Sequence, residues 1–285
     1  MLPSDFPIRQ SLCDTSPPPS AFERCFVAHG QSYGLRAQDG DLLDRLATRV
    51  PLGWHASAVA LPEISTWYLL CRADDPEAAY RLTIDGDSLI ESVSLAVVLD
   101  AFERHAELLA AERARDSLFV HAGVVAWHDR AIVMPGASGS GKTTLVRAFL
   151  AAGATYFSDE YARLDRNGCV YPYARPLSIR DNARNRVAVT AADLGSRTAT
   201  ASLPVGVILL TSYQPDAIWE PRRLSPAHTL VKLMEHTVAA RRDPEYSMMI
   251  LKAVATHAIA LESMRPEAEV VVRTVLSELF VVPTS

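Results

Sequence analysis

The segment Gly136-Ala137-Ser138-Gly139-Ser140-Gly141-Lys142-Thr143 decides the fold around it, because it matches the pattern G-x-x-x-x-G-K-[ST] at every fixed position. Its three glycines allow the backbone to turn so that successive N–H groups point inward at an anion. A short apolar run at 131–134 precedes the segment, and a helical pattern over 142–152 follows it. This order of strand, loop and helix is the context in which the pattern binds phosphate.

The side chains that follow the glycines complete the predicted phosphate site. Lys142 has the length and charge to reach the β- and γ-phosphates, and the Thr143 hydroxyl is a typical Mg²⁺ ligand. We therefore predict ATP and Mg²⁺ as cofactors, with Lys142 acting in catalysis as well as in binding. The chain has no Asn-Lys-x-Asp stretch, which disfavours a GTP switch. The predicted nucleotide-binding residues are Gly136, Ala137, Ser138, Gly139, Ser140, Gly141, Lys142, Thr143 and Thr144.

Two adjacent carboxylates, Asp159 and Glu160, follow a strand expected over 154–157. In a parallel α/β sheet, the carboxyl ends of the strands face the ligand crevice. A carboxylate placed there can hold Mg²⁺ or accept the proton of an attacking hydroxyl group. We predict Asp159 as a catalytic residue and Thr143, Glu160 and Asp159 as metal ligands. The residues alone leave open which acid is the base and which serves the metal.

One histidine and four arginines are further candidates. His121 lies in a strand expected over 119–127, where a lone histidine is more commonly a core or surface residue. An arginine could neutralise charge on a transferring phosphoryl group, although each one is individually typical of a protein surface. The four arginines are Arg175, Arg180, Arg241 and Arg242.

In their order and spacing, these segments resemble the HPr kinase/phosphorylase family and its HPr-kinase-like relatives. The resemblance covers about 118–215 and lies in His121-Ala122-Gly123-Val124-Val125, the glycine-rich loop and Asp159-Glu160. It implies a P-loop-containing α/β domain with His121 near the phosphates. It also implies that one acid acts as base toward a substrate serine while the other serves the metal. Arg180 matches the arginine of the family's Glu-Ile-Arg stretch, which implies a catalytic role for it.

The chain also departs from the family pattern. Ser178-Ile179-Arg180 stands where the family has Glu-Ile-Arg, so the glutamate near the metal is missing. The family's later glycine-containing loop, tied to phosphorolysis and to HPr binding, is not recognisable. These departures disfavour HPr as the substrate and disfavour the reverse phosphorolysis, but they leave open whether phosphorolysis also occurs. Related kinases phosphorylate the C-terminal serine of a lasso-peptide precursor, and by family likeness this branch is a specific hypothesis for the substrate.

The chain is predicted to contain a tail and two modules. Residues 1–21 are expected to be a flexible tail, because their proline-rich end cannot form a helix or a central strand. A smaller α+β module is expected over 22–115, and an HPr-kinase-like P-loop domain over 118–285. Alternating strands and helices in the second module place it in the α/β class. The first module has no chemical motif, so we expect it to recruit the acceptor.

Apolar spacing predicts particular elements within these modules. In the first module it predicts strands over 58–61 and 67–70 and a long helix over 89–115. In the second it predicts a hairpin around Asn167-Gly168, a buried strand over 205–210, and mostly helix over 225–279.

Composition excludes several classes of function. The chain has 285 residues and a net charge of -5, without a Lys/Arg run of the kind that a nucleic-acid partner would require. No apolar run is long enough to predict a membrane span. The four cysteines form no CxxC pair, which argues against structural zinc and predicts free thiols in the cytoplasm. HPr-kinase relatives are often homo-oligomers, and the sequence itself leaves the oligomeric state open.

The sequence therefore predicts an ATP- and Mg²⁺-dependent kinase. Its γ-phosphoryl group would pass to a serine hydroxyl of a peptide or protein. Two alternatives remain open at this point: a kinase for a small metabolite, and a P-loop ATPase that is not a kinase.

Overall fold

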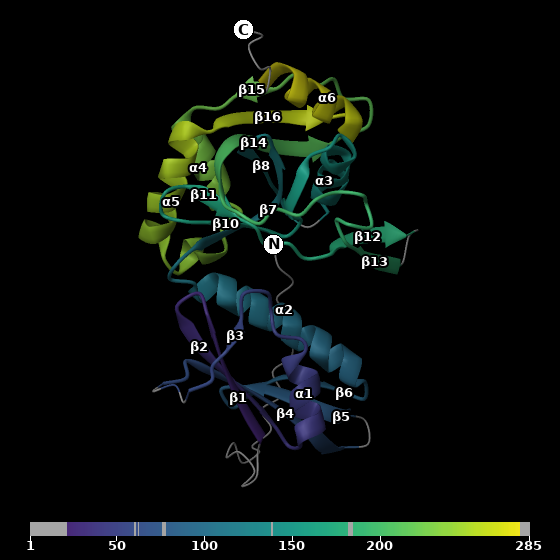
Figure 1. Ribbon diagram of the computed structural model, residues 1–285, viewed down its shortest axis with the longest axis vertical. Helices are drawn as coiled ribbons and strands as arrows, with labels where there is room; N and C mark the ends of the chain where they lie inside the picture. Colours follow the sequence, from purple (N-terminus) through teal and green to yellow (C-terminus); the bar gives the residue numbers. More distant parts are fainter. Residues whose placement is uncertain are drawn as a thin grey trace. The chain divides into compact units, whose positions relative to one another are not determined.

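The computed structural model describes residues 22–59, 61, 63–75, 78–137, 139–181 and 185–279. They form two compact units, which divide between Glu107 and Leu108 inside helix α2 (Leu95–Arg113). Both units combine helices with sheet, and the mixed α/β class expected from the sequence is confirmed (Figure 1). The tail predicted over 1–21 lies outside the described residues.

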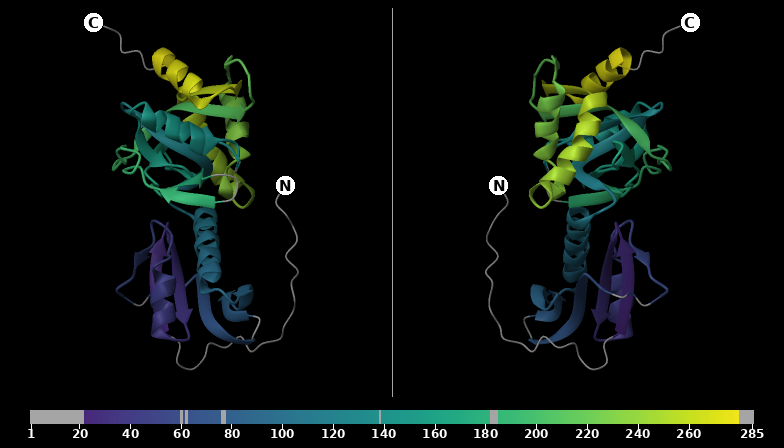
Figure 2. Two further views of the ribbon diagram at one scale, coloured as in Figure 1. Left: turned by 90° about the vertical axis from the view of Figure 1, so that its right-hand side faces the viewer. Right: turned by 90° about the vertical axis from the view of Figure 1, so that its left-hand side faces the viewer.

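The first unit is built on a six-stranded sheet with the order β3-β1-β2-β4-β5-β6. Alternate residues such as Tyr33 and Leu35 are fully buried, and helix α1 (Gly40–Ala47) lies along β1 and β2 (Figures 1 and 2). The Asp39 side chain caps α1 by accepting a hydrogen bond from the Leu42 amide. The strands are β1 (Phe22–Ala28), β2 (Gln31–Ala37), β3 (His55–Ala56), β4 (Thr66–Asp75), β5 (Ala78–Ile84) and β6 (Asp87–Ser92).

The prediction of a long helix over 89–115 is confirmed over 95–113, but its predicted beginning is wrong. Helix α2 starts at Leu95, because Leu89 and Ile90 belong to strand β6. The turn before β6 is Asp85-Gly86, where both residues have positive φ, 48° and 93°. That geometry is the two-residue hairpin that an Asp-Gly pair favours. The apolar residues at 89 and 90 therefore serve a strand, although their spacing also continues a helical pattern.

The two short strands expected in the first unit have different outcomes. The strand over 67–70 is confirmed as part of β4. The strand over 58–61 is wrong, because residues 58 and 59 form a bend and residue 61 is in no element, while residue 60 lies outside the described ranges. Val59 is 70% exposed, so its apolar side chain is not evidence of a buried strand.

The second unit is built on an eight-stranded sheet whose main path is β11-β10-β7-β8-β14-β16-β15, with β9 paired to β7. Strands β8, β14 and β16 are parallel, so their carboxyl ends meet at one edge. Strand β11 also pairs with β14, which closes β7, β8, β14, β11 and β10 into a ring. The strands are β7 (Leu118–Trp127), β8 (Arg130–Pro135), β9 (Thr155–Ser158), β10 (Tyr161–Leu164), β11 (Cys169–Tyr171), β14 (Leu203–Tyr213), β15 (Arg222–Arg223) and β16 (Ile259–Arg265), with β12 (Leu177–Asp181) and β13 (Asn185–Val189) forming a separate hairpin.

Helices cover both faces of this sheet. Val124 and Ile208 pack with α4 and α5, whereas their neighbours Val125 and Val207 pack with α3 and α6. This alternation follows the two-residue period of a strand and produces two apolar layers. Figure 1 shows α4 and α5 on one side of the sheet and α3 on the other. The helices are α3 (Lys142–Ala151), α4 (Pro226–Met234), α5 (Pro244–His257) and α6 (Ala268–Leu279), with a short 3₁₀ helix η1 (Val238–Arg241).

The expectation of mostly helix over 225–279 misses one strand. β16 lies between α5 and α6 and pairs in parallel with β14 over seven residues. The buried strand expected over 205–210 is confirmed within β14, and the Asn167-Gly168 hairpin is confirmed as the connection from β10 to β11. The missed strand matters most, because its carboxyl end lies at the same edge as the glycine-rich loop.

Helices of the described ranges all lack the length or the apolar character that crossing a membrane requires. Cys25, Cys71 and Cys169 are free thiols, as expected, and Cys13 lies outside the described residues.

Candidate phosphate-binding site

The glycine-rich loop joins the carboxyl end of β8 to the amino end of α3. Gly139 and Gly141 have φ of 85° and 90°, a left-handed backbone that residues with a side chain rarely adopt. Of the nine predicted nucleotide-binding residues, only Ser138 lies outside the described ranges. Helix α3 follows the loop directly, and the first N–H groups of a helix have no partner within that helix. This arrangement attracts anions.

The ammonium group of Lys142 lies folded against this loop. Its Nζ donates to the carbonyl oxygens of Gly136, at 2.7 Å, and Ala137, at 2.9 Å. Burial lowers the pKa of Lys142, while the charges of Glu160 and Asp159 act in the opposite direction. A cation held only by neutral carbonyls can exchange them for phosphate oxygens, which form stronger, charge-assisted hydrogen bonds.

Asp159 is joined directly to the helix that follows the loop. Thr143 Oγ1 donates to Asp159 Oδ2 at 2.8 Å, while the other oxygen, Oδ1, is buried and has no hydrogen-bond partner. Burial raises the pKa of Asp159 to about 6, the Thr143 hydrogen bond opposes the shift, and the neighbouring charge of Glu160 adds to it. A desolvated carboxylate with one unused oxygen is suited to a cation.

Glu160 faces His121 instead. The distance from His121 Nδ1 to Glu160 Oε1 is 3.7 Å, and the imidazole lies 4.6 Å from the ring centre of Tyr161. Both contacts follow from the pairing of β7 with β10, which places His121 opposite Tyr161. Burial lowers the pKa of His121, which favours the neutral imidazole although Glu160 acts against this shift. The two acids thus point to different partners, a distinction that the sequence could not supply.

The backbone of His121 connects the loop to a residue that sequence reasoning missed. Its carbonyl accepts from the Gly136 amide at 3.1 Å, and its own amide donates to the His236 carbonyl at 2.8 Å. Burial lowers the pKa of His236, and the charges of Lys142 and His121 contribute in the same direction. His236 therefore lies at this site although it follows α4, far along the chain. No local motif marks it, because only tertiary pairing of Thr237 with Val120 brings it there.

The four arginine candidates lie on different segments of the second unit. Arg242 Nε donates to the Glu112 carbonyl, and Arg241 ends η1. The Arg175 carbonyl accepts from the Tyr156 hydroxyl at 2.6 Å, so its backbone has a structural contact. Arg180 lies on β12 opposite Arg186, but its side chain is outside the described part of the structure.

An arginine that the sequence did not predict contacts the loop. Arg265, the last residue of β16, is only 2% exposed, and its Nη2 donates to the Gly141 carbonyl at 3.2 Å. Sequence reasoning missed it because the strand itself was not expected. The single signal available was Pro266, which follows it and is typical of the end of an element.

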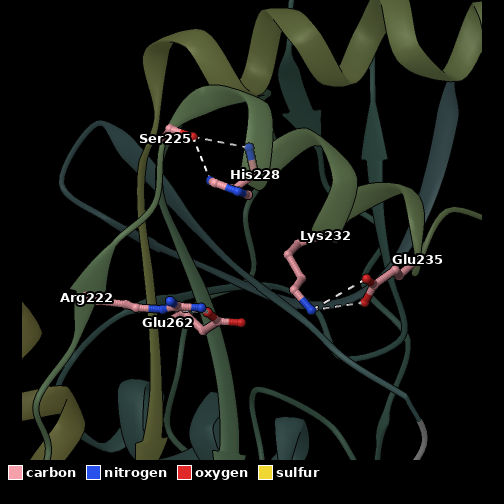
Figure 3. A network of polar contacts seen from close by, with 6 residues as sticks. All are labelled: Arg222, Ser225, His228, Lys232, Glu235 and Glu262. Atoms are coloured by element: carbon pink, nitrogen blue, oxygen red, sulfur yellow. Dashed lines mark hydrogen bonds and ion pairs between the residues drawn. The ribbon is translucent and has the colours of Figure 1, made fainter.

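Cavities among the described residues of the second unit include one beside α3 and one on β15, β16 and α4. One, of about 240 Å³, begins beside the loop at Thr144 and follows α3; its lining residues are Thr144, Arg147, Ala148, Leu150, Ala151, Leu194 and Glu269. The other, of about 110 Å³, lies in a polar cluster on β15, β16 and α4 (Figure 3). In that cluster Arg222 is paired with Glu262, and His228 Nδ1 lies 3.0 Å from the Ser225 hydroxyl. The side chains of this cluster are paired with one another or exposed, so substitutions in the cluster can serve as controls for substitutions at the loop.

The residues at the loop fit a hard divalent cation. In the described ranges, no three His, Cys, Asp or Glu side chains form a group that could hold a metal ion. Magnesium in phosphate-transfer sites is typically held by one or two protein ligands together with substrate phosphates. Thr143 and Asp159 supply such a pair, and the unpartnered Oδ1 of Asp159 is the oxygen that fits a cation.

Comparisons with known proteins find a match among solved structures but none from the sequence. No protein-family model matches the chain, and no curated protein matches it. Among solved structures, it is similar to the Hpr(Ser) kinase/phosphatase from Coxiella burnetii at 10% identity and a TM-score of 0.34. The match covers 56% of this chain and 93% of that one. At this level the likeness is a distant structural relationship and no more.

Proposed function

We propose that the chain is an ATP- and Mg²⁺-dependent phosphotransferase that passes the γ-phosphoryl group to a serine hydroxyl of a peptide or protein. The observation that carries the proposal is the hydrogen bond from Thr143 to Asp159 beside Lys142. It joins a complete phosphate-loop motif to a buried carboxylate at the edge of a mixed sheet where the parallel strands β8, β14 and β16 end. Ligands commonly bind at the carboxyl ends of parallel strands.

In the proposed complex, the loop amides and the amino end of α3 bind the phosphates. Lys142 releases the carbonyls of Gly136 and Ala137 and pairs with phosphate oxygens instead. The remainder of the nucleotide has room beside Thr144, where the 240 Å³ cavity opens. The walls contributed by Ala148 and Leu194 are apolar, as binding sites for flat rings commonly are.

Thr143 and Asp159 are the proposed ligands of Mg²⁺, which would neutralise charge that develops on the phosphates. The unpartnered Asp159 Oδ1 supports this assignment over a role as base, because Oδ2 is already held by Thr143. A nearby cation would also lower the raised pKa of Asp159 and keep it ionised.

Glu160 and His121 are proposed to receive the acceptor. The serine oxygen bonds to the γ-phosphorus as the bond from that phosphorus to the β–γ bridging oxygen breaks. The serine proton passes to Glu160, whose side chain is 54% exposed and therefore accessible to a second substrate. His121 Nδ1 lies 3.7 Å from this carboxylate, beyond hydrogen-bond distance, and is proposed to share that proton when the acceptor is bound.

The decisive experiment follows the label from [γ-³²P]ATP in the presence of Mg²⁺. The purified full chain is incubated with serine-containing peptides, with the same peptides carrying alanine for serine, with small hydroxyl metabolites, or with water alone. The proposal predicts label on the serine peptides and none on the alanine versions. Label on metabolites alone would favour the small-molecule kinase, and release of phosphate without transfer would favour the ATPase. Failure of the chain to bind ATP would overturn all three.

A further inference from the structure

Arg265 combines deep burial with a poor set of partners. It is 2% exposed and is among the largest fully buried side chains of the described residues. Its Nη2 and Nη1 donate to the carbonyls of Gly141, at 3.2 Å, and Pro266, at 3.1 Å. Its guanidinium lies 5.1 Å from the ring centre of Tyr213, and its Nε is buried without a partner.

No carboxylate among the described residues lies within ion-pair distance of this guanidinium. Glu267 and Glu269 act on it only at longer range, and Glu267 is already bonded to the Tyr213 hydroxyl at 2.8 Å. A buried charge without a counter-ion is costly, and natural proteins keep one chiefly where a ligand or function compensates it. The missing negative charge therefore calls for a source outside the described residues.

The place of Arg265 indicates what that source is. Parallel pairing aligns Arg265, the last residue of β16, with Tyr213, the last residue of β14, at the edge where the loop begins. The carbonyl that it holds, that of Gly141, also accepts the first helical bond of α3, from Leu145. Arg265 thus bonds the junction between the loop and the helix, where an anion would be bound.

Gly141 and Arg265 are also fitted to each other sterically. A Cβ atom built on Gly141 would collide with Arg265 Nη2, and the φ of 90° at Gly141 disfavours a side chain independently. The glycine is therefore needed for the close approach of the guanidinium as well as for the turn of the loop.

We propose that Arg265 is a positioning residue of the nucleotide site, which holds the Gly141 carbonyl and adds its charge to the field that attracts the polyphosphate. Bound polyphosphate then supplies the negative charge that the buried guanidinium lacks. This inference rests on the proposed function, because it requires that the loop binds a nucleotide. It adds a residue from an element outside the loop motif.

The test compares Arg265→Met, which removes the charge, with Arg265→Lys, which keeps it but loses the planar fork. Arg222→Met is the matched control, because Arg222 is an exposed arginine paired with Glu262 on the neighbouring strand (Figure 3). Calorimetry measures the Kd of Mg·ATP and of pyrophosphate at several salt concentrations. We expect Kd to rise about 10-fold or more for Arg265→Met, and less for Arg265→Lys, as loss of a charge-assisted contact implies.

Two further readouts separate positioning from simple support of the fold. The loss should be similar for Mg·ATP and pyrophosphate, and the salt dependence of Kd should become shallower in Arg265→Met, because one cation is gone. Melting curves and circular dichroism establish which variants are folded. If Arg265→Met does not fold, Arg265→Lys decides, since it retains the charge that burial must accommodate.

The outcomes are distinct. Folded Arg265 variants that bind both ligands as tightly as the wild type, with an unchanged salt slope, overturn this inference and leave the proposed function standing. A loss confined to ATP also overturns it, because the arginine would then act on the nucleoside. A wild-type chain that binds neither ligand overturns the proposed function, and this inference with it.

Discussion

Charged side chains in the first unit are satisfied by one another, whereas those at the loop edge of the second unit are not. In the first unit, arginines pair with carboxylates close to the surface, as in Arg24–Asp44, Arg36–Glu23, Arg45–Asp41 and Arg81–Glu91. At the loop edge, Lys142 contacts only carbonyls, Asp159 has an unused oxygen, and Arg265 has no carboxylate partner in the described structure. The difference indicates that a ligand is needed at the loop edge, where it would complete the contacts of these charged groups, and not in the first unit.

Neutral groups do not show the same contrast. The Trp54 indole N–H of the first unit is also buried without a partner, although its ring is stacked on Tyr33 at 4.2 Å. An orphaned neutral donor costs far less than an orphaned charge. The informative feature of the loop edge is therefore the accumulation of charged groups without full partners, which is typical of a binding site rather than of a core.

Replacing Lys142 gives the largest expected effect. Lys142→Ala should reduce phosphoryl transfer by about 10³-fold, because it removes the charge proposed to contact the transferring phosphoryl group. The matched control is Lys232→Ala on α4, whose ammonium lies 3.5 Å from Glu235 (Figure 3) and which should retain full activity. Transfer is measured with labelled ATP. Equal activity of the two variants would remove the loop from the mechanism.

The two acids should fail in different ways. Glu160→Gln should lower transfer by about 10²-fold while Mg·ATP binds as before, because it removes only the proposed proton acceptor. Asp159→Asn should instead weaken the dependence of ATP binding on Mg²⁺, because it removes a proposed metal ligand. Calorimetric titration of ATP with and without Mg²⁺ distinguishes the two. If the effects are exchanged between the positions, the assignments of base and metal ligand must also be exchanged.

Asp159 should also affect how the free energy of unfolding of the ligand-free protein depends on pH. Folding raises its pKa from 3.8 to about 6, so the folded state binds a proton more tightly than the unfolded state does. This favourable contribution is fully present below about pH 4 and is lost as pH rises through 6. Asp159→Asn should therefore raise the free energy of unfolding by roughly 2–3 kcal/mol at pH 8 and hardly at all near pH 4. Urea unfolding at both pH values measures this, and a variant less stable than wild type at pH 8 would contradict it.

The smallest effect is expected from the first unit. Arg45 and Asp41 form an exposed i,i+4 pair at 2.8 Å on α1. Such pairs contribute little because water and salt screen them. Arg45→Ala should leave the melting temperature and Mg·ATP affinity at wild-type values. A clear drop in nucleotide affinity would contradict this prediction, because it would show that an exposed ion pair of the first unit affects the site in the second unit.

The sequence predicts the parts of the site that depend on neighbouring residues. The glycine-rich loop, α3 and the acid pair after β9 are all encoded within 131–160, where local spacing and turn chemistry are sufficient. The separate partners of Asp159 and Glu160 could not be predicted, because they depend on how β9 and β10 each pair with β7. His236 and Arg265 could not be found either, since tertiary pairing alone brings them to the loop.

Errors in the fold have a similar origin. Leu89 and Ile90 fit the spacing of the helix that follows, and only the Asp85-Gly86 turn before them indicates a hairpin. Strand β16 has seven residues between two helices, and a short apolar run of that kind can belong to either element. In both places, pairing with a neighbouring strand decided the structure against the local pattern.

The ring of strands β7, β8, β14, β11 and β10 has a consequence for the order in which the protein assembles. Strand β8 leads into the loop, yet its partner β14 begins at Leu203, and β16 with Arg265 comes later still. During synthesis from the amino terminus, the loop emerges well before the strands that hold it. Contacts of such long sequence separation form slowly. The nucleotide affinity proposed for the loop should therefore appear late in folding, after β14 and β16 have been synthesised and have paired.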